Sequence, residues 1–412
     1  MNLDSIIAKK KSAAKYMIKE ITYICKNLPK RDPGSEGERL ACEYMAKVLK
    51  EDCGCDRVTI ESFEEHPGSF YGWIYLTVCC GFISIPLLFF APIASLAFLL
   101  IGLAIALLQF GTYKKLVDKL FPKKTGTNVT ALKKPTGEVK RRIIFNGHPD
   151  ATWEWPMNYH FGYLGFDLHI LSSFIGLFYF IGLAIAAIAV NGAVGGMDMS
   201  SLLAKFALGG LVFVPLWIGM FFMWNKKRIV DGANDNLSGC YMGIALLKFL
   251  KDEGIELENT ELGVVLTGSE EAGLRGAKAW AEAHKGEFDD VPTFIYAYDT
   301  IHDPKFLAAN YRDLNATVKA DKDACDLFME AAAELGIHCE KGMVPPFGGA
   351  TDSAAFAQGG FRAAGITGLN HKIEPYYHTR RDTYDNMNEE GLAGCFAVTV
   401  KTLEKFDNGA KQ

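Results

Sequence analysis

Residues 143–150 read Ile-Ile-Phe-Asn-Gly-His-Pro-Asp, so a short apolar run ends abruptly in a histidine and an aspartate. Two later apolar runs, residues 262–268 and 293–298, also end in side chains that bind metal ions. The three sets of candidate ligands are His148 with Asp150, Glu270 with Glu271, and Asp299. In an open α/β sheet the ligand crevice lies outside the carboxyl ends of the strands, so side chains that follow several strands meet in one pocket. The sequence therefore predicts one site built from distant segments.

The polar part of the chain alternates helical and strand patterns. Residues 12–50 have helical apolar spacing, whereas residues 57–63 and 127–132 are typical of strands. Later helices are expected over residues 239–251, 273–284, 322–335 and 388–406. Such alternation is typical of an α/β fold, and we expect a mixed, mostly parallel central sheet flanked by helices.

Two long apolar segments interrupt this pattern. Residues 71–113 carry no charged side chain, and a helix that spans a bilayer needs only about 20 apolar residues. Two spans are expected there, with the turn between Pro86 and Pro92, because proline is tolerated where a helix ends. A second pair is expected at residues 170–190 and 203–224, joined by a polar loop. The alternative is buried core helices in a soluble protein, although uncharged runs this long are rare in soluble domains.

The expected organisation is one polar domain interrupted by two transmembrane hairpins. The domain comprises residues 1–69, 113–167 and 225–412, hairpin 1 comprises residues 70–112, and hairpin 2 comprises residues 168–224. Because each hairpin goes out and comes back, the three polar segments lie on one side of the bilayer. The candidate ligands therefore stay together.

The charges that flank the spans predict the orientation. Eight basic residues flank the spans on the side of the polar domain, whereas Lys205 is the single basic residue near their far ends. The eight are Lys114, Lys115, Lys119, Lys123, Lys124, Lys226, Lys227 and Arg228. The positive-inside rule then places this domain in the cytosol of a four-span protein of the cell membrane. Ten cysteines without a paired spacing pattern fit reduced thiols in the same compartment. The net charge of −5 provides no basic surface for nucleic acid, so nucleic acid is not an expected partner. The lipid bilayer is an expected partner because of the two apolar hairpins. The sequence does not predict an oligomeric state.

His148 and Asp150 stand at positions i and i+2, which project to the same face of an extended chain. A metal-bound histidine usually donates its other ring N–H to a carboxylate, which fixes the tautomer, and Asp150 is suited to this task. The alternative is a surface turn around Pro149.

Glu270 and Glu271 leave an apparently buried strand side by side, where two carboxylates repel each other and are costly to desolvate without a cation. Because neighbouring side chains diverge, one can bind a metal ion while the other acts as a general base towards water. The alternative is a pair of solvated glutamates before Gly273.

Three further candidates have weaker local signals. Asp235 lies in residues 231–239, a turn that enters a helix, where it could bind two metal ions or merely form a helix cap. Asp299 ends the third apolar run, with Asp303 as a competing acid nearby. His378 lies in a polar loop, where a lone histidine is usually just exposed.

Taken in this order and in these contexts, the candidate ligands resemble those of the co-catalytic zinc aminopeptidases of the M28 family. Residues 31–37 resemble the family's R-x-x-G-S-x-G stretch, and residues 349–356 resemble its S-D-x-x-x-F substrate-side loop. The resemblance covers nearly all of the chain outside the hairpins, and it implies a zinc-exopeptidase-like fold in which the polar segments form a peptidase domain.

The resemblance implies a site with two Zn²⁺ ions, or two other divalent metal ions. His148, Asp235 and Asp299 would hold one ion, and Asp235, Glu271 and His378 would hold the other, with Asp235 bridging. It also implies that Glu270 is the general base, that Asp150 supports His148, and that the peptide bond between Asp235 and Asn236 is cis. Three carboxylates against two dications leave about one positive charge for a bridging hydroxide.

The function implied is that of an integral-membrane metallo-aminopeptidase, a hydrolase that removes N-terminal residues from peptides through a metal-bridging water. Two alternatives remain. A glutaminyl-cyclase-like acyl transferase resembles this family, but it works with a single zinc and lacks a ligand of the His148 type. A non-catalytic membrane receptor or scaffold on the same fold is the alternative of another class, and the complete set of ligand residues argues against it. A transporter is disfavoured because the expected spans carry no ionisable residue near their middle.

Overall fold

The computed structural model describes residues 2–370, 372 and 374–410. The chain folds into two compact units. Unit 1 comprises residues 1–67, 123–154 and 227–412, and unit 2 comprises residues 68–122 and 155–226. Unit 2 contains the segments expected as hairpin 1 and hairpin 2, together with residues 68–69, 113–122, 155–167 and 225–226.

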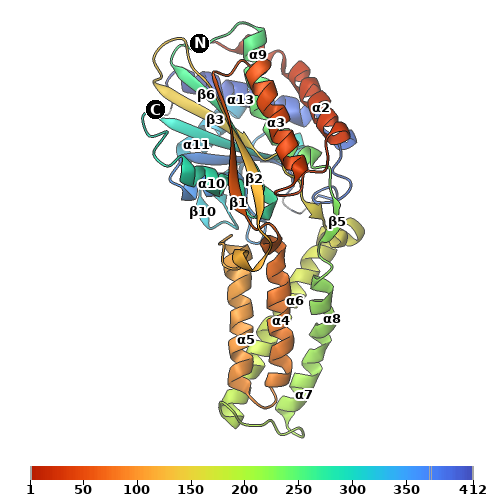
Figure 1. Ribbon diagram of the computed structural model, residues 1–412. Coiled ribbons are helices and arrows are strands. Elements are labelled where there is room, and N and C mark those ends of the chain that lie inside the picture. The colour runs from red at the N-terminus through yellow and green to blue at the C-terminus, as the bar shows by residue number, and fades with distance from the viewer. Residues whose placement is uncertain (1, 371, 373, 411–412) are drawn as a thin grey trace. The chain divides into compact units, whose positions relative to one another are not determined.

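An eight-stranded sheet forms the centre of unit 1 (Figure 1). Its strands, in spatial order, are β1 (Arg57–Glu65), β2 (Lys124–Lys133), β6 (Thr260–Thr267), β3 (Arg141–Gly147), β7 (Thr293–Ile301), β12 (Ala363–Gly368), β8 (Leu307–Asn310) and β11 (Glu340–Gly342). The four strands β6, β3, β7 and β12 run parallel to one another, whereas β1, β2 and β8 pair with antiparallel neighbours. The predicted mixed, mostly parallel sheet is thus confirmed.

The register of the central strands brings their carboxyl ends together. Gly147 at the end of β3 lies opposite Leu266 of β6, and Asn146 lies opposite Ala297 of β7. The residues that follow β3 and β6 therefore emerge beside the last residues of β7. This is the edge at which ligands bind in open α/β sheets.

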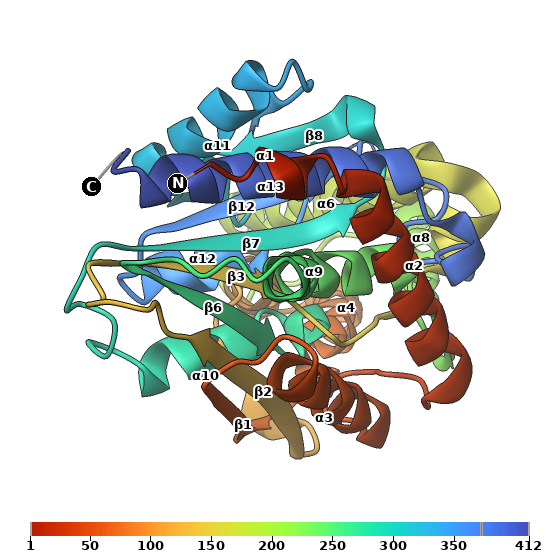
Figure 2. The ribbon, with the colours of Figure 1, turned by 90° about the horizontal axis from the view of Figure 1, so that it is seen from above.

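Helices cover both faces of the sheet (Figure 2). In that view α3 and α9 lie on one side of β2 and β6, and α10 lies on the other. The helices of unit 1 are α1 (Asp4–Ile7), α2 (Lys10–Asn27), α3 (Glu36–Glu51), α9 (Ser238–Asp252), α10 (Arg275–Ala283), α11 (Lys322–Glu334), α12 (Asp352–Gln358) and α13 (Glu389–Asp407). Short 3-10 or π turns are η2 (Asp118–Leu120), which belongs to unit 2, and η4 (Ala233–Leu237), η5 (Glu270–Ala272), η6 (Pro304–Phe306) and η7 (Tyr384–Asn386) in unit 1. Side chains of Val264, Phe145 and Tyr296 are among those that fill the core between these helices and the sheet.

Two small ladders complete the strands. Strand β9 (Arg312–Asp313) pairs with β10 (Val318–Lys319), and β4 (Trp153–Glu154) pairs with β5 (Asn225–Ile229). The β4–β5 ladder holds together the two chain segments on either side of residues 155–224.

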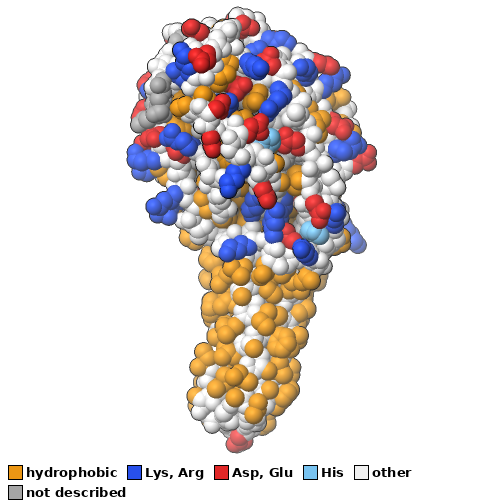
Figure 3. Space-filling model, turned by 60° about the vertical axis from the view of Figure 1, so that its left-hand side comes forward, with side chains coloured by type: hydrophobic (Ala, Val, Ile, Leu, Met, Phe, Trp, Pro, Cys, Tyr) orange, Lys and Arg blue, Asp and Glu red, His pale blue; other side chains and the backbone are white. Residues whose placement is uncertain are grey.

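Unit 2 consists of apolar helices. They are α4 (Gly68–Leu87), α5 (Pro92–Ile105) continued by η1 (Ala106–Gly111), α6 (Pro156–Asn191), and α7 (Leu202–Gly209) continued by η3 (Gly210–Phe213) and α8 (Val214–Met220). In the part of the chain that the structure describes, four helical stretches are long and apolar enough to cross a membrane: Gly68–Leu87, Pro92–Gly111, Pro156–Asn191 and Leu202–Met220. Their outward side chains are hydrophobic, whereas charged side chains are spread over unit 1 (Figure 3). Phe90, Leu100 and Phe178, for example, expose about half of their surface or more.

The helix ends in unit 2 lie close to those expected from the sequence, with one difference. The turn of the first pair falls between Leu87 and Pro92, and α7 begins at Leu202. Helix α6, however, begins at Pro156, before the expected span, and is interrupted at Gly162, whose φ of 65° and ψ of −175° are not helical. Glycine accepts this backbone conformation at little steric cost, so the helix can change direction there.

Candidate metal centre

Three adjacent strands position four of the candidate residues. His148 directly follows β3, Glu270 and Glu271 begin η5 just after β6, and Asp299 lies in β7. The apolar run before Asp299 predicts a strand that ends at Tyr298, but β7 continues to Ile301, with Asp299 opposite Thr367 of β12. Ladder hydrogen bonds with β12 extend the strand beyond the apolar residues.

The other two candidates come from loops. Asp235 lies in η4, between β5 and α9, and His378 lies in the loop between β12 and η7. The peptide bond between Asp235 and Asn236 is cis, as the resemblance implies. His378 has a φ of 54°, and Ser269, just before Glu270, has a φ of 57°. Residues other than glycine rarely adopt this left-handed backbone conformation, and those that do are often found at functional sites.

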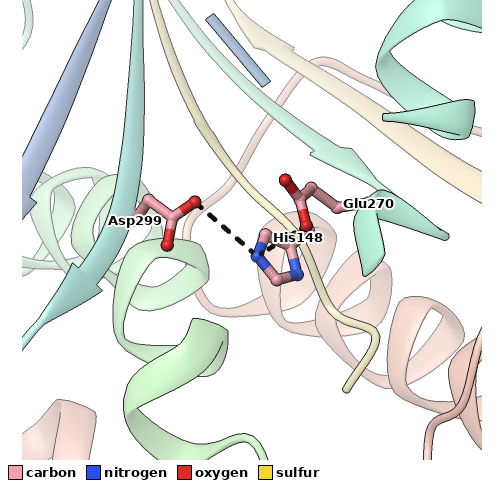
Figure 4. A group of neighbouring side chains, drawn as sticks. All are labelled: His148, Glu270 and Asp299. Carbon is pink, nitrogen blue, oxygen red and sulfur yellow. Dashed lines mark ion pairs between the residues drawn. The ribbon is translucent and has the colours of Figure 1, made fainter. Parts of the chain in front are cut away.

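Acidic side chains surround the ring of His148. Its Nε2 atom lies 3.3 Å from Asp235 Oδ1, 3.7 Å from Glu270 Oε2 and 4.0 Å from Asp299 Oδ2. Figure 4 shows His148, Glu270 and Asp299 converging from three parts of the fold. One nitrogen thus meets three carboxylates.

His378 has a similar environment on the other side of Asp235. Its Nε2 atom lies 3.0 Å from Asp235 Oδ2 and 3.2 Å from Glu271 Oε1. The two oxygens of Asp235 therefore face different histidines, Oδ1 towards His148 and Oδ2 towards His378.

Among the described residues, two groups of three have the spacing needed to hold a metal ion. The first group is His148, Glu270 and Asp299, and the second is Asp235, Glu271 and His378; in each group the potential ligand atoms lie within 4.8 Å of one another. The second group is the set that the resemblance implies. The first contains Glu270 where the resemblance implies Asp235, although Asp235 Oδ1 is the closer of the two to His148 Nε2.

The burial of these acids requires a compensating positive charge. Burial, with the nearby charge of Asp235, raises the pKa of Asp299 to about 8, and burial also raises the pKa of Glu270 well above its usual value. Burial opposes ionisation of Asp235 too, but hydrogen bonds from His148 and His378 keep its pKa below the usual range. Asp235 Oδ2 and Glu271 Oε1 are both buried and both face His378 Nε2, at 3.0 and 3.2 Å, so the single N–H of that nitrogen cannot fully satisfy both oxygens. Buried nitrogen and oxygen ligands in this arrangement fit zinc, which binds histidine and carboxylates.

Asp150 supports the centre in two ways. Its Oδ1 lies 3.3 Å from His148 Nδ1, as the sequence pattern suggests. The same carboxylate also accepts hydrogen bonds from the backbone N–H groups of Glu270, at 3.1 Å, and Glu271, at 3.0 Å. Asp150 is fully buried and therefore fixes both His148 and the start of η5.

Asp382 is a supporting residue that sequence reasoning missed. Its Oδ1 accepts hydrogen bonds from the backbone and side-chain nitrogens of Asn234, at 2.8 and 2.9 Å, and its Oδ2 accepts one from the backbone N–H of Asp235, at 3.1 Å. Burial raises its pKa to about 7. Its position four residues after His378, in a loop rich in polar residues, provides no local signal that distinguishes it from a solvated acid.

Arg31, the first residue of the motif at residues 31–37, links two of the site loops. Its buried guanidinium donates to the carbonyl oxygens of Pro149, at 2.7 Å, and Gly232, at 3.1 Å. The first carbonyl belongs to the loop of His148 and the second to the loop of Asp235. The sequence indicates that this motif matters but does not predict which contacts it makes.

Tyr377 and Asp352, the latter from the expected substrate-side loop at residues 349–356, also lie near the centre. The ring of Tyr377 stacks on that of His378, with 3.9 Å between the centroids. Asp352, at the start of α12, is buried and accepts a hydrogen bond of 2.5 Å from Thr267 Oγ1 at the end of β6.

The fold and the sequence were compared with known proteins. Residues 221–403 match the sequence model of peptidase family M28. No curated protein sequence matches the chain at a significant level.

Several solved structures have the same fold at low sequence identity. The aminopeptidase from Aneurinibacillus sp. strain AM-1 is 14% identical, with a TM-score of 0.56 over 95% of this chain and 93% of that chain. BSAP, a zinc aminopeptidase from Bacillus subtilis, is 12% identical, with a TM-score of 0.56 over 95% and 94%. The glutaminyl cyclase from Porphyromonas gingivalis is 11% identical, with a TM-score of 0.54 over 96% and 98%.

The matched segment supplies Asp235, Glu270, Glu271, Asp299 and His378. His148 comes from outside it, and the sheet brings His148 to the same edge. Residues 221–403 thus match peptidase family M28, and the chain as a whole shares its fold with the solved zinc aminopeptidases.

Proposed function

We propose that the protein is an integral-membrane metallo-aminopeptidase that removes N-terminal residues from peptides with the help of two zinc ions. The observation that carries this proposal is the position of Asp235, whose two oxygens face His148 and His378, each of which also contacts another acid. A carboxylate shared in this way is suited to bridge two cations.

The proposed ligands of one ion are His148, Asp235 and Asp299, and those of the other are Asp235, Glu271 and His378. The 3.3 Å distance from His148 to Asp235, compared with 3.7 Å to Glu270, supports Asp235 in the first set. Glu270 belongs to neither set of ligands and is therefore available as the general base. Imidazole and carboxylate ligands are compatible with zinc, and zinc is proposed because BSAP, which shares the fold, is a zinc aminopeptidase.

Metal ions held by these ligands would lower the pKa of water and polarise a carbonyl group. Glu270 accepts a proton from the attacking water and passes it to the leaving amine. Asp150 keeps the backbone of Glu270 and Glu271 in place through the two N–H hydrogen bonds. His148, oriented by the same carboxylate, stays fixed while the proton moves.

The role of each glutamate is tested by substitution. Glu270→Gln is expected to keep both metal ions and lose about 100- to 10,000-fold in turnover, the contribution of a general base. Glu271→Ala is expected to lose one ion. Glu282→Gln, an exposed neighbour on α10, is the control. Equal metal content and equal activity in the two variants would refute the assignment.

A glutaminyl-cyclase-like acyl transfer is the second candidate, because a glutaminyl cyclase shares the fold at a similar TM-score. The contact of His148 with Asp235 argues for the two-metal hydrolase, since the cyclase-like site is expected to lack this ligand. Incubation of the protein with peptides that begin with alanine, leucine or glutamine distinguishes the two. Release of the first residue supports the proposal, whereas loss of ammonia from glutaminyl peptides alone supports the cyclase.

The proposed location is the cell membrane. Hairpins 1 and 2, at residues 70–112 and 168–224, would provide four spans, and the peptidase domain would comprise residues 1–69, 113–167 and 225–412. The lengths and hydropathies of the four apolar helices support this proposal. The basic residues beside the span ends support a cytosolic peptidase domain.

A further inference from the structure

The carboxylate of Glu154 and the guanidinium of Arg380 form a two-pronged ion pair within unit 1. Arg380 Nε lies 2.5 Å from Glu154 Oε1, and Arg380 Nη2 lies 2.7 Å from Glu154 Oε2. The backbone N–H of Arg380 also donates to Oε1, at 3.3 Å. Glu154 is completely buried. Although burial opposes ionisation, the hydrogen bonds and charge of Arg380 hold the pKa of Glu154 below its usual value, so the pair is ionic.

The pair joins the two segments that carry the histidines. Glu154 lies six residues after His148, and Arg380 lies two residues after His378. The ion pair therefore connects the segment of one proposed metal position with that of the other, although neither side chain is a proposed ligand.

His378 needs this kind of external support. Its φ of 54° is unfavourable for a residue with a side chain, so the loop must hold it from both sides. Within the loop, Thr379 Oγ1 lies 2.9 Å from the carbonyl oxygens of both Pro375 and Tyr376, which share its single hydrogen. Asp382 binds the segment of Asp235, and Arg380 binds the segment of His148.

Glu154 is also the last residue of unit 1 before the chain enters unit 2. It ends β4, which pairs with β5 on the returning segment. Arg228 of β5 places its Nε 3.7 Å from Glu154 Oε2. The pairing of β4 with β5 thus holds the backbone of Glu154 in place, and the carboxylate of Glu154 can in turn position Arg380.

From these contacts we infer that Glu154 and Arg380 are positioning residues that hold His378 in place and so set the affinity for the metal ion that His378 binds. The inference rests on the proposed two-metal function. Partners that orient a metal ligand without touching the metal typically change metal affinity by 10- to 100-fold, and an effect of this size is expected here.

The test measures stepwise metal binding by the full-length protein in detergent, stripped by chelation and then titrated with Zn²⁺. His378→Ala and His148→Ala show which binding step belongs to which histidine. In Glu154→Gln and Arg380→Gln, the step assigned to His378 is expected to weaken 10- to 100-fold while the other changes less than about threefold. Arg380→Lys, which keeps the charge but not the two-pronged contact, is expected to fall between these variants and the wild type. Arg381→Gln, at the adjacent exposed arginine, is the matched control.

A second measurement does not depend on metal. Hydrogen exchange of the backbone over residues 374–383 in the metal-free protein is expected to speed up in Arg380→Gln and Glu154→Gln but not in Arg381→Gln. The double variant Glu154→Gln/Arg380→Gln is expected to be no worse than the more affected single variant, because the two residues act as one unit.

Unchanged binding of the His378 ion together with unchanged exchange in Arg380→Gln would overturn the inference, as would equal weakening of both binding steps. A wild-type protein that binds no metal would instead contradict the proposed function. The two failures are therefore distinguishable.

Discussion

Glu65, the last residue of β1, lies with its Oε1 only 2.6 Å from the hydroxyl oxygen of Ser269. The same hydroxyl lies 2.7 Å from Glu38 Oε2. A serine hydroxyl has one hydrogen to donate, so at least one of the two buried glutamates must carry a proton and donate to Ser269. Burial raises the pKa of Glu65 to about 7 and that of Glu38 well above its usual value, in agreement with a shared proton.

Glu65 is expected to make the folded protein less stable as the pH rises. Its pKa of about 7 in the folded state exceeds the usual value of 4.5, so its contribution is fully present below pH 4.5 and is lost as the pH rises through 7. At about 1.4 kcal/mol per pH unit, the loss amounts to roughly 3 kcal/mol. Glu65→Gln removes this dependence, and thermal unfolding between pH 5 and 8 should show a flatter profile. The exposed neighbour Glu64→Gln should keep the wild-type profile.

Asp235→Asn is expected to release both metal ions, whereas Asp299→Asn should release only one. The physical reason is that Asp235 offers an oxygen to each histidine, while Asp299 approaches His148 alone. Metal analysis after gel filtration provides the stoichiometry, and peptide hydrolysis should fall more than about 100-fold in both variants. If Asp235→Asn retained two ions, the shared carboxylate would not be the centre of the site.

Exhaustive chelation of the wild-type protein is expected to abolish hydrolysis and lower the melting temperature. Without cations the buried carboxylates around His148 and His378 lose the charge that compensates them. Addition of Zn²⁺ should restore both properties, and addition of Ca²⁺, which prefers six or more oxygen ligands, should not. Full activity in the chelated protein would contradict a metal mechanism.

Asp150→Asn should weaken metal binding by about 10- to 100-fold, as is typical for a carboxylate behind a metal-bound histidine. The amide keeps the size of the side chain but loses the negative charge and one of the two acceptor oxygens that face His148, Glu270 and Glu271. Asp385→Asn, at an exposed aspartate, is the control. Zinc titration of both variants provides the comparison.

A C-terminal tag is expected to be protected from external protease in intact cells, because the basic residues beside the spans favour the cytosol. A second tag inserted in the loop at residues 191–201 should be digested, since this loop joins the two spans of hairpin 2 at their far end. The opposite pattern would reverse the proposed orientation.

The parts of the fold that the sequence predicts are those encoded within short segments. The runs before His148 and Glu270 end at the true ends of β3 and β6, because apolar residues and strand ends coincide there. The four apolar helices follow from segments with almost no charge. The apolar run before Asp299 does not end with its strand, because pairing with β12 extends β7 beyond the apolar residues.

The supporting contacts were not predictable, because they join residues far apart in the chain. Asp382 binds Asn234 across 148 residues, and Arg380 binds Glu154 across 226. Each of these residues has ordinary polar neighbours in the sequence. Only the sheet, which brings distant segments to one edge, gives them their partners.

The three-part construction of unit 1 also sets an order of events during synthesis. A ribosome completes His148 before residues 155–226 and adds Asp235, Glu271 and His378 after them. The nascent chain therefore contains only one of the two candidate metal-site histidines until all four apolar helices have been translated. Under the proposed function, peptide cleavage could not begin on the ribosome before these helices exist, and no active enzyme without its proposed anchor would arise during translation.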